Sequence, residues 1–172
     1  KNLPLCKFFF MITKATIKDI SLIQDLAQQS WRSHYPGIIS HEQIDFMLNL
    51  MYSEEEITRQ FNNPNYHYYL LGDAENFYGI MGFENHYEQN TTKLHRIYIT
   101  EDGKGKGLGK EAIQFLKNQI LEVGDQRIIL ALNKQNPSYH FYLSQGFKVY
   151  EEGVFDIGNG FVMDDYLMEW NA

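Results

Sequence analysis

The 172-residue chain has very little of several features that define whole classes of protein. Its single cysteine, Cys6, cannot form an internal disulfide, so a reducing, cytoplasmic setting is expected. There is no cysteine cluster, and the histidines show no metal-ligand spacing, so no metal is expected. No apolar run exceeds five residues. A membrane-spanning helix needs ~20, so no membrane is expected as a partner.

Positive charge is also scarce, because 15 lysines and arginines stand against 22 aspartates and glutamates, for a net charge of -7. A general nucleic-acid binder needs a positive surface, so nucleic acid is not expected as a partner. The four prolines are scattered, with no internal repeat and no linker, which predicts one domain over residues 1–172. Residues 1–10 are consistent either with the start of that domain or with an extension upstream of a true start at Met11.

Aromatic residues are abundant, with 12 Tyr, 12 Phe and 2 Trp, which indicates a well-filled core. Hydrophobic patterning and turn residues predict seven strands, at 9–15, 66–71, 77–87, 92–99, 127–132, 147–157 and 161–170. Helices are predicted after the capping residues Asp19, Ser40 and Ser53, after the loop 103–109, and after Asn136-Pro137. This mixed order predicts an α/β or α+β fold layered around a mixed sheet.

The strongest chemical signal is the glycine-rich segment 103–109, between a predicted strand and a predicted helix. Glycines let backbone N–H groups converge on a ligand, and a helix N-terminus adds unpaired donors and partial positive charge. Lys104, Lys106 and Lys110 reverse the sign of an otherwise acidic chain, as a pyrophosphate site requires. A flexible surface loop is the alternative. The spacing fits neither a P-loop nor a dinucleotide-binding fingerprint.

A second segment, 133–147, follows the next predicted strand. Together the two segments resemble the GNAT superfamily of acetyl-CoA-dependent N-acetyltransferases. The family's loop reads Gln/Arg-x-x-Gly-x-Gly/Ala, and its second motif has an Asn and then a Tyr shortly before Gly-Phe. The matching residues are Lys104, Gly107 and Gly109 in the first segment and Asn136, Tyr142, Gly146 and Phe147 in the second. Lys104 stands where the family usually has Gln or Arg. This difference affects the side-chain contact expected at that position, but not the site as a whole.

The resemblance covers residues 12–170. It implies a mixed, mostly antiparallel sheet of about seven strands with helices on both faces. It also implies acetyl-CoA as co-substrate and direct attack by a primary amine of a small molecule in a ternary complex. The region 31–45 is loosely similar to bacterial polyamine-acetylating members, which makes a polyamine one candidate acceptor. A protein or peptide N-acetyltransferase and a non-catalytic CoA-binding sensor stay open as alternatives, and so does a homodimer.

The resemblance also implies where acetyl-CoA binds. Its pantetheine arm is expected along the backbone of Ile97, Tyr98 and Ile99, with the N–H of about Ile99 polarising the thioester carbonyl. The pyrophosphate is expected at Lys104, Gly105, Lys106, Gly107, Leu108, Gly109 and Lys110. Asn136 is expected to contact pantetheine, with a plain helix cap as the alternative. Tyr142 is expected to protonate the leaving thiolate, with core packing as the alternative.

An amine acceptor needs a base, because a free alkyl amine has a pKa of about 10.4 and is mostly charged at neutral pH. Glu84 is the first candidate, and strand alternation puts His86 on the same face. His95 is a third candidate, while solvated surface roles and a water chain are the alternatives.

Acceptor selectivity in the family comes from the first two helices and the last hairpin. In the first two helices the residues implied are Trp31, His34, Tyr35 and Phe46, and Glu84 and His86 of the predicted strand 77–87 are also expected to bind the acceptor. The acidic pair Asp164-Asp165 in the last hairpin would also suit a cationic amine. A solvated turn is the alternative for that pair.

Overall fold

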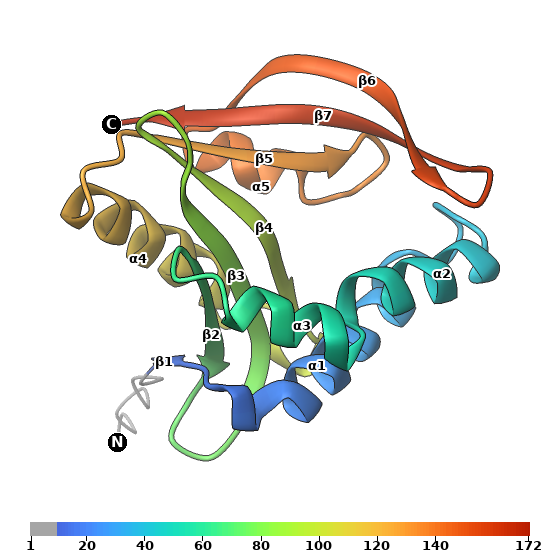
Figure 1. Ribbon diagram of the computed structural model, residues 1–172, viewed down its shortest axis with the longest axis horizontal. Coiled ribbons are helices and arrows are strands. Elements are labelled where there is room, and N and C mark those ends of the chain that lie inside the picture. The colour runs from blue at the N-terminus through green and yellow to red at the C-terminus, as the bar shows by residue number, and fades with distance from the viewer. Residues whose placement is uncertain (1–9) are drawn as a thin grey trace, which may run out of the picture.

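The computed structural model describes residues 10–172, so Cys6 and most of segment 1–10 lie outside it. Seven strands form one sheet in the order β1-β2-β3-β4-β5-β7-β6 (Figure 1). The strands are β1 (Met11–Lys14), β2 (Tyr66–Gly72), β3 (Phe77–Glu88), β4 (Thr91–Ile99), β5 (Arg127–Asn133), β6 (Lys148–Gly158) and β7 (Phe161–Asn171). The helices are α1 (Ile20–His34), α2 (His41–Tyr52), α3 (Glu54–Phe61), α4 (Leu108–Glu122) and α5 (Tyr139–Ser144).

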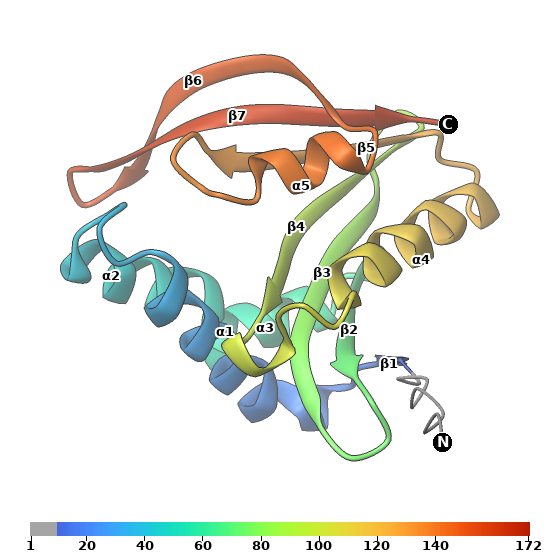
Figure 2. The ribbon, with the colours of Figure 1, turned by 180° about the vertical axis from the view of Figure 1, so that it is seen from behind.

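The predicted fold class and element order are confirmed. The sheet is mixed and mostly antiparallel, and helices cover both of its faces (Figures 1 and 2). Two short 3-10 turns, η1 (Ile17–Asp19) and η2 (Glu101–Gly103), are the additions to the predicted order. None of the helices within residues 10–172 is long and apolar enough to cross a membrane.

Two hydrophobic cores lie on opposite faces of the sheet, because strand residues alternate between faces. Beneath α1, α2 and α3, Trp31 of α1 shares a core with Tyr68 of β2 and Ile80 of β3. Beneath α4 and α5, Leu116 of α4 shares the second core with Phe83 of β3. Because the side chains of β3 alternate between the two faces, this one strand packs against the helices on both sides of the sheet.

The sheet opens in its middle. β4 and β5 are its one parallel pair, and they pair only over residues 91–93 and 127–129. Beyond these residues β4 continues along β3 and β5 continues along β7, so the two halves of the sheet diverge (Figure 1). The divergence leaves one edge of β4 without a strand partner within the described chain.

Serine caps start two of the helices, as predicted. The Ser40 hydroxyl accepts a hydrogen bond from the N–H of Gln43 at 3.1 Å, and α2 follows. The Ser53 hydroxyl accepts one from the N–H of Glu56 at 3.3 Å, and α3 follows. Glu56 does not complete a capping box with Ser53, because its carboxylate instead bonds to Arg59, three residues further along α3.

The predicted start of α5 is wrong by two residues. Asn136-Pro137 was expected to cap and begin the helix, but α5 begins at Tyr139, with Ser138 before it. The Asn136 Oδ1 accepts a hydrogen bond from the N–H of Ser138 at 2.9 Å, which makes a local turn. An Asn side chain can close such a turn in place of capping a helix, and that competition moves the helix start.

Candidate active site

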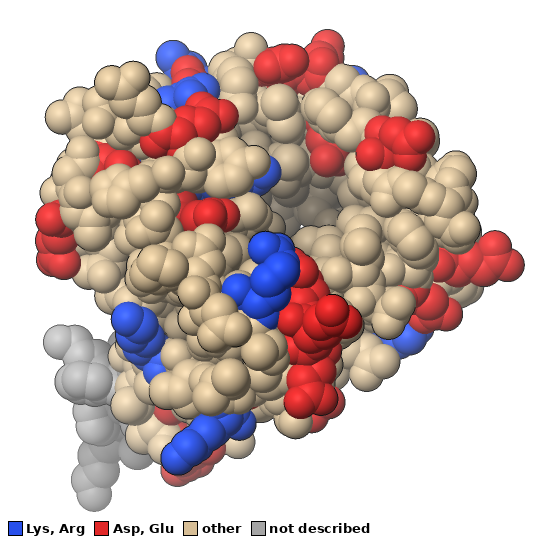
Figure 3. Space-filling model, viewed as in Figure 1, with Lys and Arg blue, Asp and Glu red and all other residues tan. Residues whose placement is uncertain are grey.

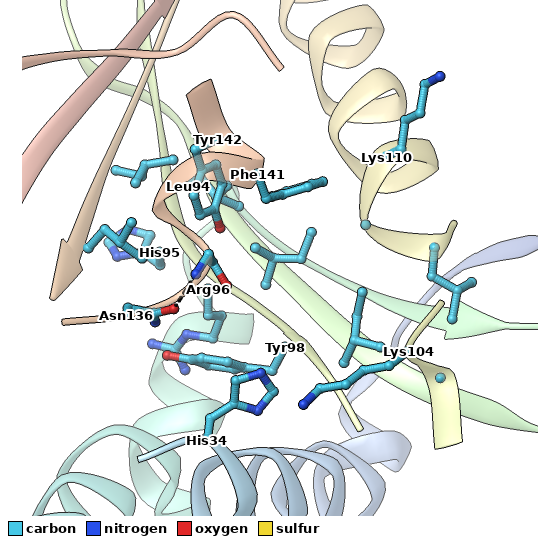
Figure 4. Close-up of a pocket in the computed structure, with 18 of the residues that line it drawn as sticks. His34, Leu94, His95, Arg96, Tyr98, Lys104, Lys110, Asn136, Phe141 and Tyr142 are labelled. Carbon is cyan, nitrogen blue, oxygen red and sulfur yellow. Dashed lines mark hydrogen bonds between the residues drawn. The ribbon is translucent and has the colours of Figure 1, made fainter. Parts of the chain in front are cut away.

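A cavity of about 360 Å³ opens where β4 and β5 diverge. It is lined by residues 94–99 of β4, residues 130–132 of β5, the glycine loop, α5 and the end of α1. The space-filling view shows a hollow between the β6–β7 hairpin and helices α1 to α3, with acidic side chains on its rim (Figure 3). In the close-up, Tyr142 and Phe141 lie on one side of the cavity and Tyr98 and His34 on the other (Figure 4). Segments far apart in the chain thus meet in one place.

A bulge in β4 shapes this cavity. In the register with β3, Arg96 faces Gly82 and Leu94 faces Phe83, so His95 is an extra residue. On the other edge of β4, residues 94–99 line the cavity and have no strand partner in the described chain. Backbone groups that are unpaired in a strand can bind an extended ligand as an added strand would. Ile97, Tyr98 and Ile99, the predicted pantetheine contacts, lie on this edge.

The glycine loop bends into the N-terminus of α4. Gly105 and Gly107 have positive φ angles of 72° and 84°, and Gly107 is the N-cap of α4. A side chain at either position would strain the backbone, because L residues rarely adopt such angles. The first N–H groups of a helix have no partner within the helix and attract anions. Gly107, Leu108 and Gly109 all line the cavity at this end.

The three lysines of the loop differ in placement. Lys104 lines the cavity and forms an ion pair with Glu101, and its amino group points toward His34 (Figure 4). The Lys106 amino group lies 3.7 Å from the centre of the Tyr78 ring. The Lys110 side chain points away from the cavity, although its residue lines the wall (Figure 4). Lys104 is therefore the loop lysine best placed to meet an anion within the cavity.

Tyr142 lines the cavity from α5, and only 6% of its surface is exposed. Its ring packs edge-on against Phe141 and Phe147, with centroid distances of 5.2 and 5.6 Å. Burial, with a smaller contribution from Tyr98, raises the pKa of its hydroxyl above the usual value for tyrosine. The hydroxyl is thus protonated at neutral pH and can donate a proton into the cavity.

Asn136 and Tyr35 line the cavity together near the end of α1. The Asn136 side chain interacts with the Tyr35 hydroxyl, while burial raises the pKa of that hydroxyl well above its usual value. Trp31, predicted to contact the acceptor, lies in the core beneath, with 2% of its surface exposed. Its ring stacks on Tyr35 at a centroid distance of 4.3 Å. The expectation of direct contact is therefore corrected for Trp31, which supports Tyr35 from below.

Glu84 does not line the cavity, and His95 does. The Glu84 Oε2 lies 3.0 Å from the His95 Nε2, and the Glu84 Oε1 accepts a hydrogen bond from Asn63 at 2.8 Å. Burial lowers the pKa of His95 to about 4, against the opposing effect of the Glu84 carboxylate. The His95 ring stacks on Tyr66 at 5.0 Å. Glu84 can therefore influence the cavity only through its contact with His95.

The prediction that His86 shares a face with Glu84 is wrong. His86 has a positive φ of 53°, and it lies where the regular pairing with β4 is interrupted, between Glu84 and Glu88. Its N–H and its Nδ1 both bond to the Asp125 carboxylate, at 2.9 and 2.8 Å. Asp125 is buried and also accepts a hydrogen bond from Thr92. This network turns His86 toward the C-terminal end of α4, away from the cavity-lining residues.

Two further residues of the cavity wall, Arg96 and Phe141, were not predicted from the sequence. Arg96 is a buried residue of the cavity wall, and its Nη1 donates a hydrogen bond to the Tyr68 hydroxyl at 2.6 Å. Phe141 lies beside Tyr142, and a Cβ added at Gly109 would meet its ring at 3.2 Å. An arginine in an apolar strand is a clue to a buried polar network, but its partners come from distant segments. No short motif could have named them.

The family model of the acetyltransferase (GNAT) domain matches residues 38–166. The chain belongs to the GNAT acetyltransferase family. It is 26% identical over 156 residues to the spermidine N(1)-acetyltransferase of Thermoplasma acidophilum, covering 89% of this chain and 94% of that protein.

Two solved structures extend the comparison of the GNAT fold. A PaiA N-acetyltransferase from Thermoplasma acidophilum, in complex with coenzyme A, has a TM-score of 0.81 at 23% identity and covers 95% of this chain and 99% of that one. The ribosomal-protein-S18-alanine N-acetyltransferase of Escherichia coli has a TM-score of 0.72 at 14% identity, with coverage of 95% and 94%. This GNAT chain is therefore an N-acetyltransferase that takes acetyl-CoA as its co-substrate.

Proposed function

We propose that the protein transfers an acetyl group from acetyl-CoA to a primary amine of a small molecule, with a polyamine as the leading candidate. One observation carries the proposal. The unpaired edge of β4, the glycine loop and the buried Tyr142 hydroxyl all line a single cavity. The likeness to a spermidine N(1)-acetyltransferase over most of both chains supports the polyamine.

The residues of the cavity wall suit acetyl-CoA, which supplies the acetyl thioester when bound. The free backbone of Ile97, Tyr98 and Ile99 would hold the pantetheine arm, and Asn136 would contact it beside Tyr35. The loop from Lys104 to Lys110 would hold the pyrophosphate, since the φ angles of Gly105 and Gly107 turn the chain into the N-terminus of α4. In this assignment Lys110 acts through its backbone, and Lys106 adds positive charge at the rim.

Tyr142 would protonate the leaving thiolate, since its hydroxyl is held protonated inside the cavity. Glu84 would act as a positioning residue that holds His95 at the bulge of β4. His86 is turned toward Asp125, so Tyr35 is the stronger of the two as an acceptor contact.

A thiol-release assay with acetyl-CoA tests the proposal against polyamines, amino-sugar drugs and short peptides. We expect turnover on polyamines and a loss of at least ~100-fold in kcat for Tyr142→Phe, with acetyl-CoA affinity unchanged. Tyr139→Phe removes a hydroxyl from the same short helix outside the cavity lining, and should keep wild-type turnover. Turnover on peptides alone would move the acceptor class to proteins. Tight acetyl-CoA binding with no acetylated amine would favour a sensor domain.

Three further expectations belong to this proposal. The single cysteine supports a cytoplasmic, reducing setting. The continuous sheet from β1 to β7 supports one domain over residues 1–172. The homodimer stays a prediction, which sedimentation at several concentrations would test.

A further inference from the structure

Asp165, in the middle of β7, is a buried carboxylate. Only 8% of its surface is exposed, and its Oδ1 has no hydrogen-bond partner among the described residues. A buried carboxylate oxygen without a partner is costly, because ionised groups lose their hydration on burial. The alternative of a solvated turn at Asp164-Asp165 does not hold, since both residues lie within a strand.

The neighbour of Asp165 in sequence behaves differently. The Asp164 side chain is 53% exposed, and its Oδ1 forms an ion pair with the Lys134 amino group at 2.8 Å. Lys134 also pairs with Glu152 at 3.0 Å. The nearby lysine is therefore already bound by two exposed carboxylates, and no hydrogen bond from it reaches Asp165 in this structure.

The strand register shows which way Asp165 faces. Asp165 lies directly opposite Asn133 of β5, and Ala131 is two residues before Asn133. Residues two apart in a strand share a face, so Asp165 lies on the same face of the sheet as Ala131. Ala131 lines the cavity, as Leu130 and Leu132 do from the other face of β5, and Asp165 is not itself a lining residue. Leu130 and Leu132, on the other face of β5, belong to the core beneath α4 and α5.

Other groups on this side of the sheet confirm the neighbourhood. Burial raises the pKa of the Tyr35 and Tyr98 hydroxyls, and the Asp165 carboxylate lies close enough to both to add a small contribution in the same direction. These tyrosines line the cavity, opposite Tyr142 in the case of Tyr98. The groups that act on Asp165 itself are Asp164 and Lys134. Asp165 is thus a buried acid without a hydrogen-bond partner for its Oδ1 among the described residues, close to Tyr35 and Tyr98 of the cavity wall.

We propose that Asp165 receives the ammonium group of the acceptor amine and takes its proton. The inference rests on the proposed function and deepens it, because it names the group that recognises and activates the acceptor. One N–H bond of the ammonium breaks and one O–H bond forms on the Asp165 carboxylate. The electron pair stays on nitrogen, which becomes the neutral nucleophile. The carboxylic acid returns its proton to water after the product leaves, so charge and atoms balance.

Asp165 suits this role better than His95, the other titratable candidate of the site. Burial, with a smaller effect of Asp164, raises the pKa of Asp165 to about 6. Burial instead lowers the pKa of His95 to about 4. A general base works best with a pKa near the working pH, and a carboxylate also attracts the cationic acceptor, whereas neutral imidazole does not. Alcohols and amides, which carry no positive charge, would gain nothing from Asp165.

The test compares Asp165→Asn with His95→Gln, using Glu151→Gln as a control that removes one exposed carboxylate from the same hairpin. Two quantities are measured besides turnover: the dissociation constant of acetyl-CoA, and that of spermidine for the CoA-bound protein, both by calorimetry. For Asp165→Asn we expect kcat/KM for the amine to fall at least ~100-fold. Spermidine binding should weaken at least ~10-fold with acetyl-CoA binding unchanged. Glu151→Gln should match wild type in every quantity.

The pH dependence of kcat/KM distinguishes Asp165 from His95 as the base. Wild-type kcat/KM for the amine should fall on acidification with a midpoint near 6, and Asp165→Asn should lack that limb. If Asp165→Asn keeps wild-type amine kinetics while His95→Gln loses the limb, the proposal is overturned and His95 is the base. If wild type neither binds nor acetylates any amine, the proposed function fails and this inference fails with it. If wild type acetylates an amine and Asp165→Asn is indistinguishable from it, only this inference fails.

Discussion

The His95 Nε2 lies 3.0 Å from the Glu84 Oε2, at the point where one extra residue of β4 interrupts its pairing with β3. Asn63 donates a hydrogen bond to the other oxygen of the same carboxylate, at 2.8 Å. Glu84 is therefore held from α3's C-terminal turn on one side and holds His95 on the other. The Glu84 carboxylate therefore connects the β4 bulge, which places His95 in the cavity wall, to the turn after α3.

Glu84→Gln should weaken that connection while preserving shape. Because the Glu84 carboxylate raises the pKa of His95, its removal should lower that pKa further, below the value of about 4. We expect kcat to fall by roughly 3–10-fold, as for a positioning residue, with acetyl-CoA affinity unchanged. NMR titration of the His95 ring, assigned with His95→Gln, and the thiol-release assay measure both effects. Glu55→Gln on exposed α3 is the control. A rise in the His95 pKa would contradict this account.

Gly107→Ala should impair acetyl-CoA binding by more than its cost in stability explains. A residue with a Cβ at a φ of 84° is strained by ~1 kcal/mol, and relief of that strain would shift the backbone N–H groups at the N-terminus of α4. Gly124, just past the other end of α4, has a φ of 89° and open space around it. Gly124→Ala should therefore lose similar stability in urea denaturation but keep acetyl-CoA affinity. Gly107→Ala should lose about 10-fold in affinity by calorimetry. Equal affinities in the two variants would count against the pyrophosphate assignment.

The order of helices and strands could be predicted because hydrophobic periodicity and turn residues are local signals. The cofactor loop could be predicted because its glycines and its position before a helix carry the chemistry themselves. The face of His86 could not be predicted, since strand alternation assumes a regular strand and His86 has a positive φ within the irregular stretch between Glu84 and Glu88. Trp31 could not be separated from Tyr35, because only the packing of α1 on β4 decides which ring is exposed to the cavity.

The burial of Asp165 was also beyond local reasoning. Its two neighbours across the sheet, Asn133 and Gly153, come from different segments, and only their pairing places one acid inside and the next outside. The acidic pair could be named from the sequence, but the sequence could not say which of the two residues is buried, or exclude a solvated turn. Pairing between distant strands decides burial in place of such local patterns, and predictions from local sequence fail most often at functional residues.

Tyr68→Phe should be strongly destabilising although it removes a single oxygen. The Tyr68 hydroxyl donates to the Gln60 side chain at 2.5 Å and accepts from Arg96 at 2.6 Å. Its loss leaves a buried amide oxygen and a buried guanidinium short of a partner, which should cost about 2–3 kcal/mol in the free energy of unfolding. Tyr87→Phe removes an exposed hydroxyl that accepts from Lys93, and should stay within about 0.5 kcal/mol of wild type. Urea denaturation measures both, and similar values would refute the buried network.

Asp165→Asn should stabilise the fold at neutral and alkaline pH while it impairs amine binding. The folded-state pKa of Asp165, about 6, lies above the usual value for aspartate, so its ionised form is destabilising in the folded protein. Above pH 6 that cost is fully present, and it disappears as pH falls below about 4, where both folded and unfolded states are protonated. The shift corresponds to roughly 1–2 kcal/mol after allowance for solvent screening.

The measurement is the difference in unfolding free energy between Asp165→Asn and wild type, by urea denaturation from pH 4 to pH 8. The difference should be positive at pH 8 and shrink toward zero at pH 4, because the remaining carboxylates cancel between the two proteins. Glu151→Gln should give a difference near zero across the range. A variant less stable than wild type at pH 8 would mean that Asp165 already has a partner inside the protein. An amine bound at Asp165 should reverse the order by stabilising wild type alone. A carboxylate that destabilises the free protein and stabilises the acceptor-bound protein behaves as a binding group does, and not as a structural group does.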